Sequence, residues 1–180
     1  MAHPEQGNYL RSVRHRFPDK FSNCRVLDIG SLDINGNNRY LFSNYTYVGV
    51  DIGAGKNVDV VCRGHEYKDD QPFDIVISSE CFEHDEFWNL TIQNAINLLK
   101  PGGLLLFTCA TTGRPEHGTR RTTPQDSPFT SLIENDYYMN LTAKDVVNAI
   151  DMNQFSQYSF ESRQGSMWPQ DLYFWGIKTL

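Results

Sequence analysis

The sequence has no excess of positive charge and no paired cysteines. Its 180 residues include 16 Lys and Arg against 22 Asp and Glu, a formal net charge of −6. Nonspecific binding to nucleic acid depends on Lys and Arg that neutralise phosphates, so this balance disfavours nucleic acid as a partner. Because Cys24, Cys62, Cys81 and Cys109 lack CxxC spacing and stand beside apolar residues, they are predicted to be buried thiols rather than metal ligands or disulfides.

Long apolar runs, repeats and low-complexity segments are also missing. We therefore expect no membrane partner and no secretory leader, which makes the cytoplasm the default location. A hydrophobic content of 39% and a charged content of 21% are those of a globular protein. A chain of this length falls in the range of one domain, so residues 1–180 are predicted to form a single domain, with no indication of its oligomeric state.

Apolar runs alternate with turn residues as in an α/β protein. Seven runs have the patterns of strands: 24–30, 45–53, 58–62, 73–80, 104–110, 157–163 and 171–179. Helical spacing predicts a helix over 85–100, ended by Pro-Gly-Gly, and another over 142–153 with Thr142 as its N-cap. Residues 1–20 are predicted to form an amphipathic helix over one sheet face, with a solvated basic side.

The order of these elements predicts the sheet. Strands that alternate with helices pair in parallel, and right-handed crossovers favour an open, doubly wound sheet. The connection between the last two strands is too short for a crossover helix, so that pair is predicted to be antiparallel. Some thirty residues, 111–140, separate the fifth strand from the last helix, far beyond the usual length of a connection.

Two acids stand where ligands bind in such sheets, beyond the carboxyl ends of the strands. Asp51 ends the second strand and can accept both hydroxyls of a ribose. Asp28, at the turn after the first strand, would repel a pyrophosphate but tolerate a cation. The G-x-G-x-x-G fingerprint is absent, which disfavours a nicotinamide-dependent oxidoreductase. A nucleoside without phosphates but with positive charge, such as S-adenosylmethionine, fits both acids.

Four stretches, VLDIGSLDING, YVGVDI, FDIVISSECFEH and LLKPGGLLLFT, resemble in order and spacing the successive motifs of class I S-adenosylmethionine-dependent methyltransferases. The resemblance covers roughly residues 20 to 112. It implies a Rossmann-like fold, S-adenosyl-L-methionine as cofactor and transfer of its methyl group to a small molecule. The cofactor-binding residues are then predicted to be Asp28, Gly30, Ser31, Asn35, Asp51, Ile52, Arg63, Gly64, Ser79 and Glu80.

The first and third loops depart from the family pattern. Leu32 and Ile34 fill places where the family has glycines, and we expect Asn35 and Gly36 to make the tight turn instead, since φ > 0 is accessible to both. This resembles the GSxxxNG variant of the small type 11 group, several members of which stand in saccharide-biosynthesis contexts. Arg63 takes the place of an acid that often reads adenine, so backbone groups near Arg63 and Gly64 are expected to bind it.

Methyl transfer needs mainly positioning, and a general base only if the acceptor must lose a proton. His117, in the loop 111–140, is the preferred candidate base, and His84 the other. That loop is predicted to be an acceptor site or lid. The proposed acceptor is an oxygen of a saccharide or related metabolite. If the arginines of the loop (Arg114, Arg120, Arg121) grip an anion, the acceptor could be acidic, unless nearby acids neutralise them.

Structural alternatives remain for each residue. Asp28 could cap its turn, Asp51 could pair with Lys56, and Glu83 and His84 could only start the next helix. His117 could lie in a mobile surface loop. The chain could also bind the nucleoside without catalysis, as a regulator or subunit, and RNA methylation is disfavoured by the acidic balance. No motif demands a metal ion.

Overall fold

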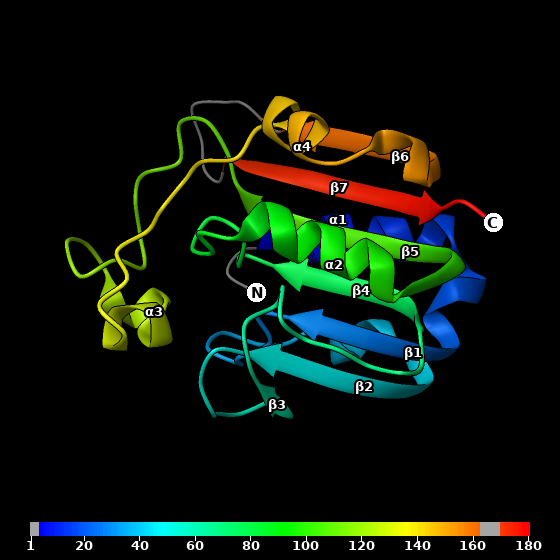
Figure 1. Ribbon diagram of the computed structural model, residues 1–180, viewed down its shortest axis with the longest axis horizontal. Coiled ribbons are helices and arrows are strands. Elements are labelled where there is room, and N and C mark those ends of the chain that lie inside the picture. Colours follow the sequence, from blue (N-terminus) through cyan, green and yellow to red (C-terminus); the bar gives the residue numbers. More distant parts are fainter. Residues whose placement is uncertain (1–3, 163–169) are drawn as a thin grey trace.

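A seven-stranded sheet forms the centre of the fold in the computed structural model, which describes residues 4–162 and 170–180 (Figure 1). The strand order is β3-β2-β1-β4-β5-β7-β6. Pairing is antiparallel where β7 meets β5 and β6, and parallel elsewhere. The strands are β1 (Ser22–Ile29), β2 (Ser43–Asp51), β3 (Val60–Val61), β4 (Phe73–Ser79), β5 (Leu99–Ala110), β6 (Phe155–Ser162) and β7 (Asp171–Lys178).

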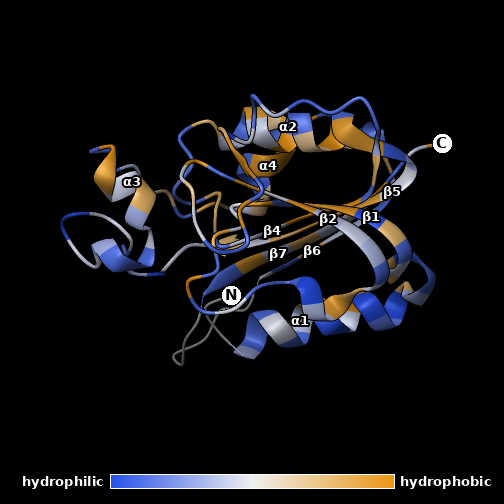
Figure 2. Cartoon of the chain, turned by 90° about the horizontal axis from the view of Figure 1, so that it is seen from below, coloured by the Kyte–Doolittle hydropathy of each residue, from blue (hydrophilic) through white to orange (hydrophobic). Residues whose placement is uncertain are grey.

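Helices cover both faces of this sheet. Figure 2 shows α2 and α4 on one side and α1 on the other, so the predicted doubly wound α/β fold with an antiparallel final pair is confirmed. None of the helices in the described residues is long and apolar enough to cross a membrane. The α-helices are α1 (Pro4–Arg16), α2 (Trp88–Leu98), α3 (Pro128–Leu132) and α4 (Ala143–Ala149), and the short 3-10 helices are η1 (Pro18–Phe21), η2 (Arg39–Leu41), η3 (Pro124–Asp126) and η4 (Met152–Gln154).

The central strands divide their apolar side chains between two cores. Because successive residues of a strand point to opposite faces, Leu105 and Phe107 of β5 pack under α2 and α4, while Leu104 and Leu106 pack with α1. Both sets are buried, as predicted for a central strand. The basic residues of the last turn of α1 lie on its outer side, so the N-terminal segment covers the sheet as expected.

Both predicted helices are observed over shorter ranges: α2 begins and ends within the predicted 85–100, and α4 ends at Ala149, before the predicted end at residue 153. The Pro-Gly-Gly segment lies inside β5. Leu99 already pairs with Phe73, and the pairing resumes at Leu104 after a bulge formed by residues 100–103. The helix therefore ends before this segment. At α4, Thr142 is the N-cap as predicted: its Oγ1 accepts the amide hydrogen of Asp145 at 3.2 Å, and its own amide donates to that carboxylate at 2.8 Å.

Residues 111–140, called here the β5–α4 connection, contain η3 and α3 rather than an irregular loop alone. Figure 1 shows this connection reaching beyond the end of the sheet toward which β1, β2 and β4 point. The predicted strand 157–163 is observed as β6 up to Ser162; Arg163 and most of the turn to β7 lie outside the described residues.

Candidate functional site

One cavity lies at the carboxyl ends of β1, β2 and β4, next to the point where the strand order reverses. The structure brings together all ten residues predicted from the motifs, since each of them lines this cavity. His84 also lines it, whereas His117 does not. Segments far apart in the sequence complete the wall, among them the turn after β4 and the β5–α4 connection.

Asp28 is a buried carboxylate with neutral partners. It is 2% exposed, it accepts a short hydrogen bond from the Tyr47 hydroxyl, and the Asn38 amide lies 3.5 Å from both of its oxygens. Burial raises the pKa of Asp28 to about 7, although both hydrogen bonds lower it. The alternative in which Asp28 caps its turn is therefore wrong, because its hydrogen bonds go to the side chains of Tyr47 and Asn38. A carboxylate in this setting favours a cationic ligand.

Asp51 is held from behind by two backbone amides. Leu32 N donates to its Oδ2 at 3.0 Å and Ile52 N to its Oδ1 at 2.8 Å, which leaves further lone pairs on both oxygens. Burial raises the pKa of Asp51. The alternative pairing with Lys56 is wrong, because Lys56 instead lies 2.8 Å from Asp33. The Asp51 carboxylate is thus fixed in the cavity wall with capacity to accept hydroxyl hydrogens.

The loop after β1 turns at glycines. Gly30 has φ +76°, and a Cβ added there would lie 2.5 Å from the Cβ of Cys81, so only glycine fits. Gly36 has φ +109°, and its amide donates to Asp33 at 2.8 Å. Of the two residues expected to make this turn, Gly36 adopts a positive φ and Asn35 does not, because the Asp33 side chain closes the turn with one positive-φ residue.

Cys62 and Cys81 line the cavity and are only partly buried, so the prediction of four buried thiols is wrong for these two and correct for Cys24 and Cys109. All four are free thiols. Cys62 follows the end of β3 and Cys81 follows the end of β4, so both thiols lie beside the open cavity, which explains their exposure.

Arg63 does not project freely into the cavity. Its guanidinium lies 3.4 Å from the carboxylate of Glu86 and 5.2 Å from the centroid of the Phe87 ring. Arg63, Gly64 and Glu86 all line the cavity, so this ion pair is part of its wall.

A cluster of three carboxylates, Glu80, Glu83 and Asp171, surrounds Arg114. Arg114 Nη1 lies 2.8 Å from Asp171 Oδ1, and Nη2 lies 3.7 Å from Glu80 Oε2. Burial and mutual repulsion raise the pKa of Glu80 well above its ordinary range, and burial raises that of Glu83 to about 7. One guanidinium thus faces three acids in a place from which water is largely excluded.

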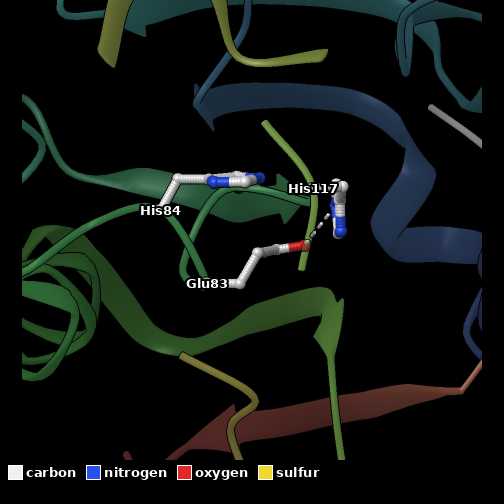
Figure 3. A group of neighbouring side chains, drawn as sticks. All are labelled: Glu83, His84 and His117. Atoms are coloured by element: carbon white, nitrogen blue, oxygen red, sulfur yellow. Dashed lines mark ion pairs between the residues drawn. The ribbon is translucent and has the colours of Figure 1, made fainter. Parts of the chain in front are cut away.

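Glu83, His84 and His117 lie together at the edge of this cluster, and Figure 3 shows their side chains converging. Glu83 is fully buried and precedes α2 by several residues, so the alternative in which Glu83 and His84 start that helix is wrong. His117 Nε2 lies 3.9 Å from Glu83 Oε1, and its ring packs against those of His84 and Tyr138. His117 is therefore not in a detached surface loop.

Both imidazoles are poor proton acceptors in this setting. Burial, and to a smaller extent the neighbouring His117, lowers the pKa of His84 to about 3, and burial also lowers the pKa of His117. A general base works best when its pKa lies near the operating pH. The two predicted catalytic residues are thus adjacent, but both are neutral imidazoles at neutral pH.

The β5–α4 connection covers part of the cavity through α3. A Cβ added to Gly53 would lie 2.5 Å from the Phe129 ring, and Gly55 is close to the end of the same ring. Arg120 and Arg121 of the connection are paired with Asp136 and Glu116 at 2.8 Å, and Arg114 is buried in the acid cluster. None of these three arginines lines the cavity.

Some residues of the site were missed by sequence reasoning. Asn38 and Tyr47 contact Asp28 from a 3-10 turn and from β2, and Phe129 reaches the cavity from α3. Tyr47 alone had a usable signal, since it precedes Asp51 on the same strand and alternate strand residues share a face. No spacing rule connects Asn38 or Phe129 with this site.

Comparison with known proteins gives a consistent picture. A protein-family model described as "Methyltransferase domain" matches residues 1–130. Among solved structures, Burkholderia thailandensis 1,6-didemethyltoxoflavin N1-methyltransferase has a TM-score of 0.70 at 12% identity, covering 99% of this chain and 80% of that one. Haemonchus contortus phosphoethanolamine N-methyltransferase 2 has a TM-score of 0.66 at 17% identity, covering 96% and 53%. At 12% and 17% identity, the similarity to these two structures shows the fold of this chain and nothing beyond it.

A sequence relative is far larger. The hybrid PKS-NRPs synthetase opdA of Penicillium oxalicum is 28% identical over 123 residues, covering 54% of this chain. The chain spans about 3% of the length of that curated relative.

Proposed function

Since the chain belongs to the methyltransferase-domain family and has the class I fold, we propose that it binds S-adenosyl-L-methionine and transfers the methyl group to a small molecule. The observation that supports this most directly is the pair of carboxylates in one cavity wall. Asp51 presents acceptors to a ribose, and Asp28 offers a buried carboxyl group among neutral partners, whose ionised form a cationic ligand would stabilise. The residues present fit a cationic nucleoside without phosphates.

In this proposal the chain's residues bind and orient. Asp51 accepts the ribose hydroxyls, Asp28 with Asn38 and Ser79 faces the amino-acid end, and the backbone at Arg63 and Gly64 contacts the base. Gly30, Ser31, Asn35, Ile52 and Glu80 complete the wall. The cofactor supplies an electrophilic methyl group on sulfur. The rate then depends mainly on holding an acceptor atom in line with that group, which is a positioning effect.

The acceptor is proposed to lie beside His84, under the β5–α4 connection, which acts as the acceptor loop or lid. His84 faces the cavity, and His117 and Glu83 stand behind it. We assign His84 to acceptor contact and His117 to positioning. An oxygen of a saccharide or related metabolite remains the proposed acceptor atom.

An amine acceptor is the second candidate, because the cavity wall is acidic. Asp28, Asp51, Glu80, Asp85, Glu86 and Asp126 line it, against Arg63 as a basic lining residue. This lining favours neutral or cationic acceptors over anionic ones. A panel of a neutral sugar, an aminosugar and a sugar acid, followed by measurement of S-adenosylhomocysteine formation, distinguishes them. Tight cofactor binding without turnover of any acceptor in a broad panel would favour a non-catalytic regulator or subunit.

The first test is calorimetric titration of S-adenosylmethionine and S-adenosylhomocysteine into the protein, Asp51→Ala and a control, Asp59→Asn. Asp59 directly precedes β3 and does not line the cavity, and an Asn keeps an oxygen for the Gly49 amide. Asp51→Ala is expected to weaken binding at least tenfold, about 1.4 kcal/mol, and Asp59→Asn to leave it unchanged. Absence of binding to either nucleoside would overturn the proposal.

A further inference from the structure

The group formed by Glu83, His84 and His117 has the chemistry of a metal site. Glu83 and His84 come from the turn after β4, and His117 comes from the β5–α4 connection. One ligand atom from each of these side chains lies within 4.8 Å of the other two, and Figure 3 shows the three side chains facing a common space. Two imidazoles and one carboxylate form a common ligand set for Zn²⁺ and other divalent transition metals.

One polar atom of this group, His84 Nδ1, is buried without a hydrogen-bond partner, on a residue that is 7% exposed. The Glu83 carboxyl group is fully buried and lies against that of Glu80. A buried polar atom without a partner has lost its hydrogen bond to water, so such an atom in a native protein calls for a specific explanation. Coordination of a cation by this group would provide one.

The hydrogen bond of His117 also suits a ligand. Its Nδ1 lies 3.2 Å from the Pro115 carbonyl oxygen, which only a protonated Nδ1 can engage. In the neutral ring, Nε2 therefore carries a lone pair, and it faces Glu83 Oε1 at 3.9 Å. A backbone carbonyl on the far nitrogen is the usual arrangement for a metal-binding histidine, because it fixes the tautomer.

The charges around this group also favour a cation as its ligand. Glu80, Glu83 and Asp171 are buried around the single guanidinium of Arg114. Three buried carboxyl groups thus share one guanidinium. A divalent cation at Glu83 would supply positive charge that the cluster lacks, whereas an anion would add to the repulsion.

We propose that Glu83, His84 and His117 bind one divalent transition-metal ion, with Zn²⁺ as the best match. Ligand atoms of a tetrahedral Zn²⁺ site lie about 3.3 Å apart, so the three side chains need to approach one another slightly on binding. Three protein ligands leave a further coordination position for water or another molecule. Because His84 lines the cavity, that position can take an oxygen or nitrogen of the acceptor, a consequence that rests on the proposed function.

Direct metal binding tests this inference. The protein is stripped with a chelator, dialysed and titrated with Zn²⁺ by calorimetry, and with Co²⁺ by visible absorption, which reports its coordination. One ion per chain is expected to bind. Glu83→Gln, which keeps an oxygen for the Ala110 amide, and His117→Ala are each expected to weaken binding at least tenfold. The control His15→Ala, an exposed histidine on α1, and Cys62→Ser, a thiol in the same cavity, are expected to have no effect.

Three results would overturn the inference: no stoichiometric binding to the folded wild type, binding that survives both substitutions, or binding lost in Cys62→Ser. Circular dichroism establishes folding, and the partly exposed His117 decides the matter if Glu83→Gln does not fold. S-adenosylmethionine is titrated into the same samples. Nucleoside binding without metal binding refutes only the metal site, and metal binding without nucleoside binding refutes only the proposed function.

Discussion

The end of the cavity beside Asp28 and Asp51 is held by strand ends, whereas the end beside His84 is built from a turn and a long connection. At the first end, each carboxylate accepts hydrogen bonds from neighbours within the sheet and its first loop. At the second end, His84 Nδ1 is buried without a partner, and the Glu83 carboxyl group is buried beside that of Glu80. The two carboxylates of the first end are thus held by hydrogen bonds within the protein, while the second end has a buried imidazole nitrogen with unused capacity to bind a ligand.

The largest expected effect comes from the second end. Arg114→Met should destabilise the protein by about 3 to 5 kcal/mol, because it leaves Asp171 and Glu80 as buried acids without their cation. Urea unfolding measures this loss. Arg121→Met, which removes an exposed ion pair of the same connection, should cost far less. Equal losses in the two variants would show that the acid cluster does not depend on Arg114.

A smaller, pH-dependent effect is expected at the first end. The pKa of Asp28 is about 7 in the folded protein and near 3.9 when unfolded, so the folded state holds a proton that the unfolded chain loses over about pH 4 to 7. Wild-type stability therefore falls as the pH rises through that window. Asn does not titrate, so the free energy of unfolding of Asp28→Asn, taken relative to the wild type, should be roughly 2 to 3 kcal/mol higher at pH 8 than at pH 5.

Asp33, in the loop that follows β1, provides the control for Asp28, which lies within that strand. Its pKa is lowered to about 2, mainly by Lys56 and Asn37, so it stays ionised throughout that range. Any stability difference between Asp33→Asn and the wild type should not change between pH 5 and pH 8. Denaturant unfolding at both pH values checks the two variants. If the stability difference between Asp28→Asn and the wild type is the same at pH 5 and pH 8, Asp28 titrates like an exposed acid.

The smallest expected effect concerns the contact between the two parts of the wall. Phe129→Ala removes the ring that packs on Gly53 and Gly55, and should weaken nucleoside binding about fivefold, roughly 1 kcal/mol of lost apolar contact. Leu132→Ala, on the same helix but 78% exposed and outside the cavity wall, should leave binding unchanged. Equal affinities of Phe129→Ala and the wild type would show that α3 does not cover the nucleoside.

The contrast between the two ends also explains what the sequence could predict. Asp28 and Asp51 each follow an apolar run, and parallel strands bring such positions to one edge, so chain order alone located them. The neighbourhood of Glu83 and His117 depends on the path of the β5–α4 connection, whose polar residues have no period. Glu83 had the position of a helix-starting acid, and its burial became visible only in three dimensions.

The boundaries of helices and strands show the same contrast between local and long-range causes. The start of α4 at its N-cap Thr142 was predictable because a capping residue acts on amides three positions away. The start of β5 at Leu99 was not, because the pairing with Phe73 across a four-residue bulge overrides the turn preference of Pro-Gly-Gly.

The placement of β7 between β5 and β6 has a consequence for the order in which the protein is assembled during synthesis. Leu104 of β5 pairs with Ile177, so the ribosome must add about seventy residues before this ladder can close. Until then β5 is an open edge that can pair with another nascent chain. Asp171 is made with β7, so Arg114 lacks this partner until more than fifty residues have been added after it, and a chaperone that binds the chain earlier would meet the acid cluster without Asp171.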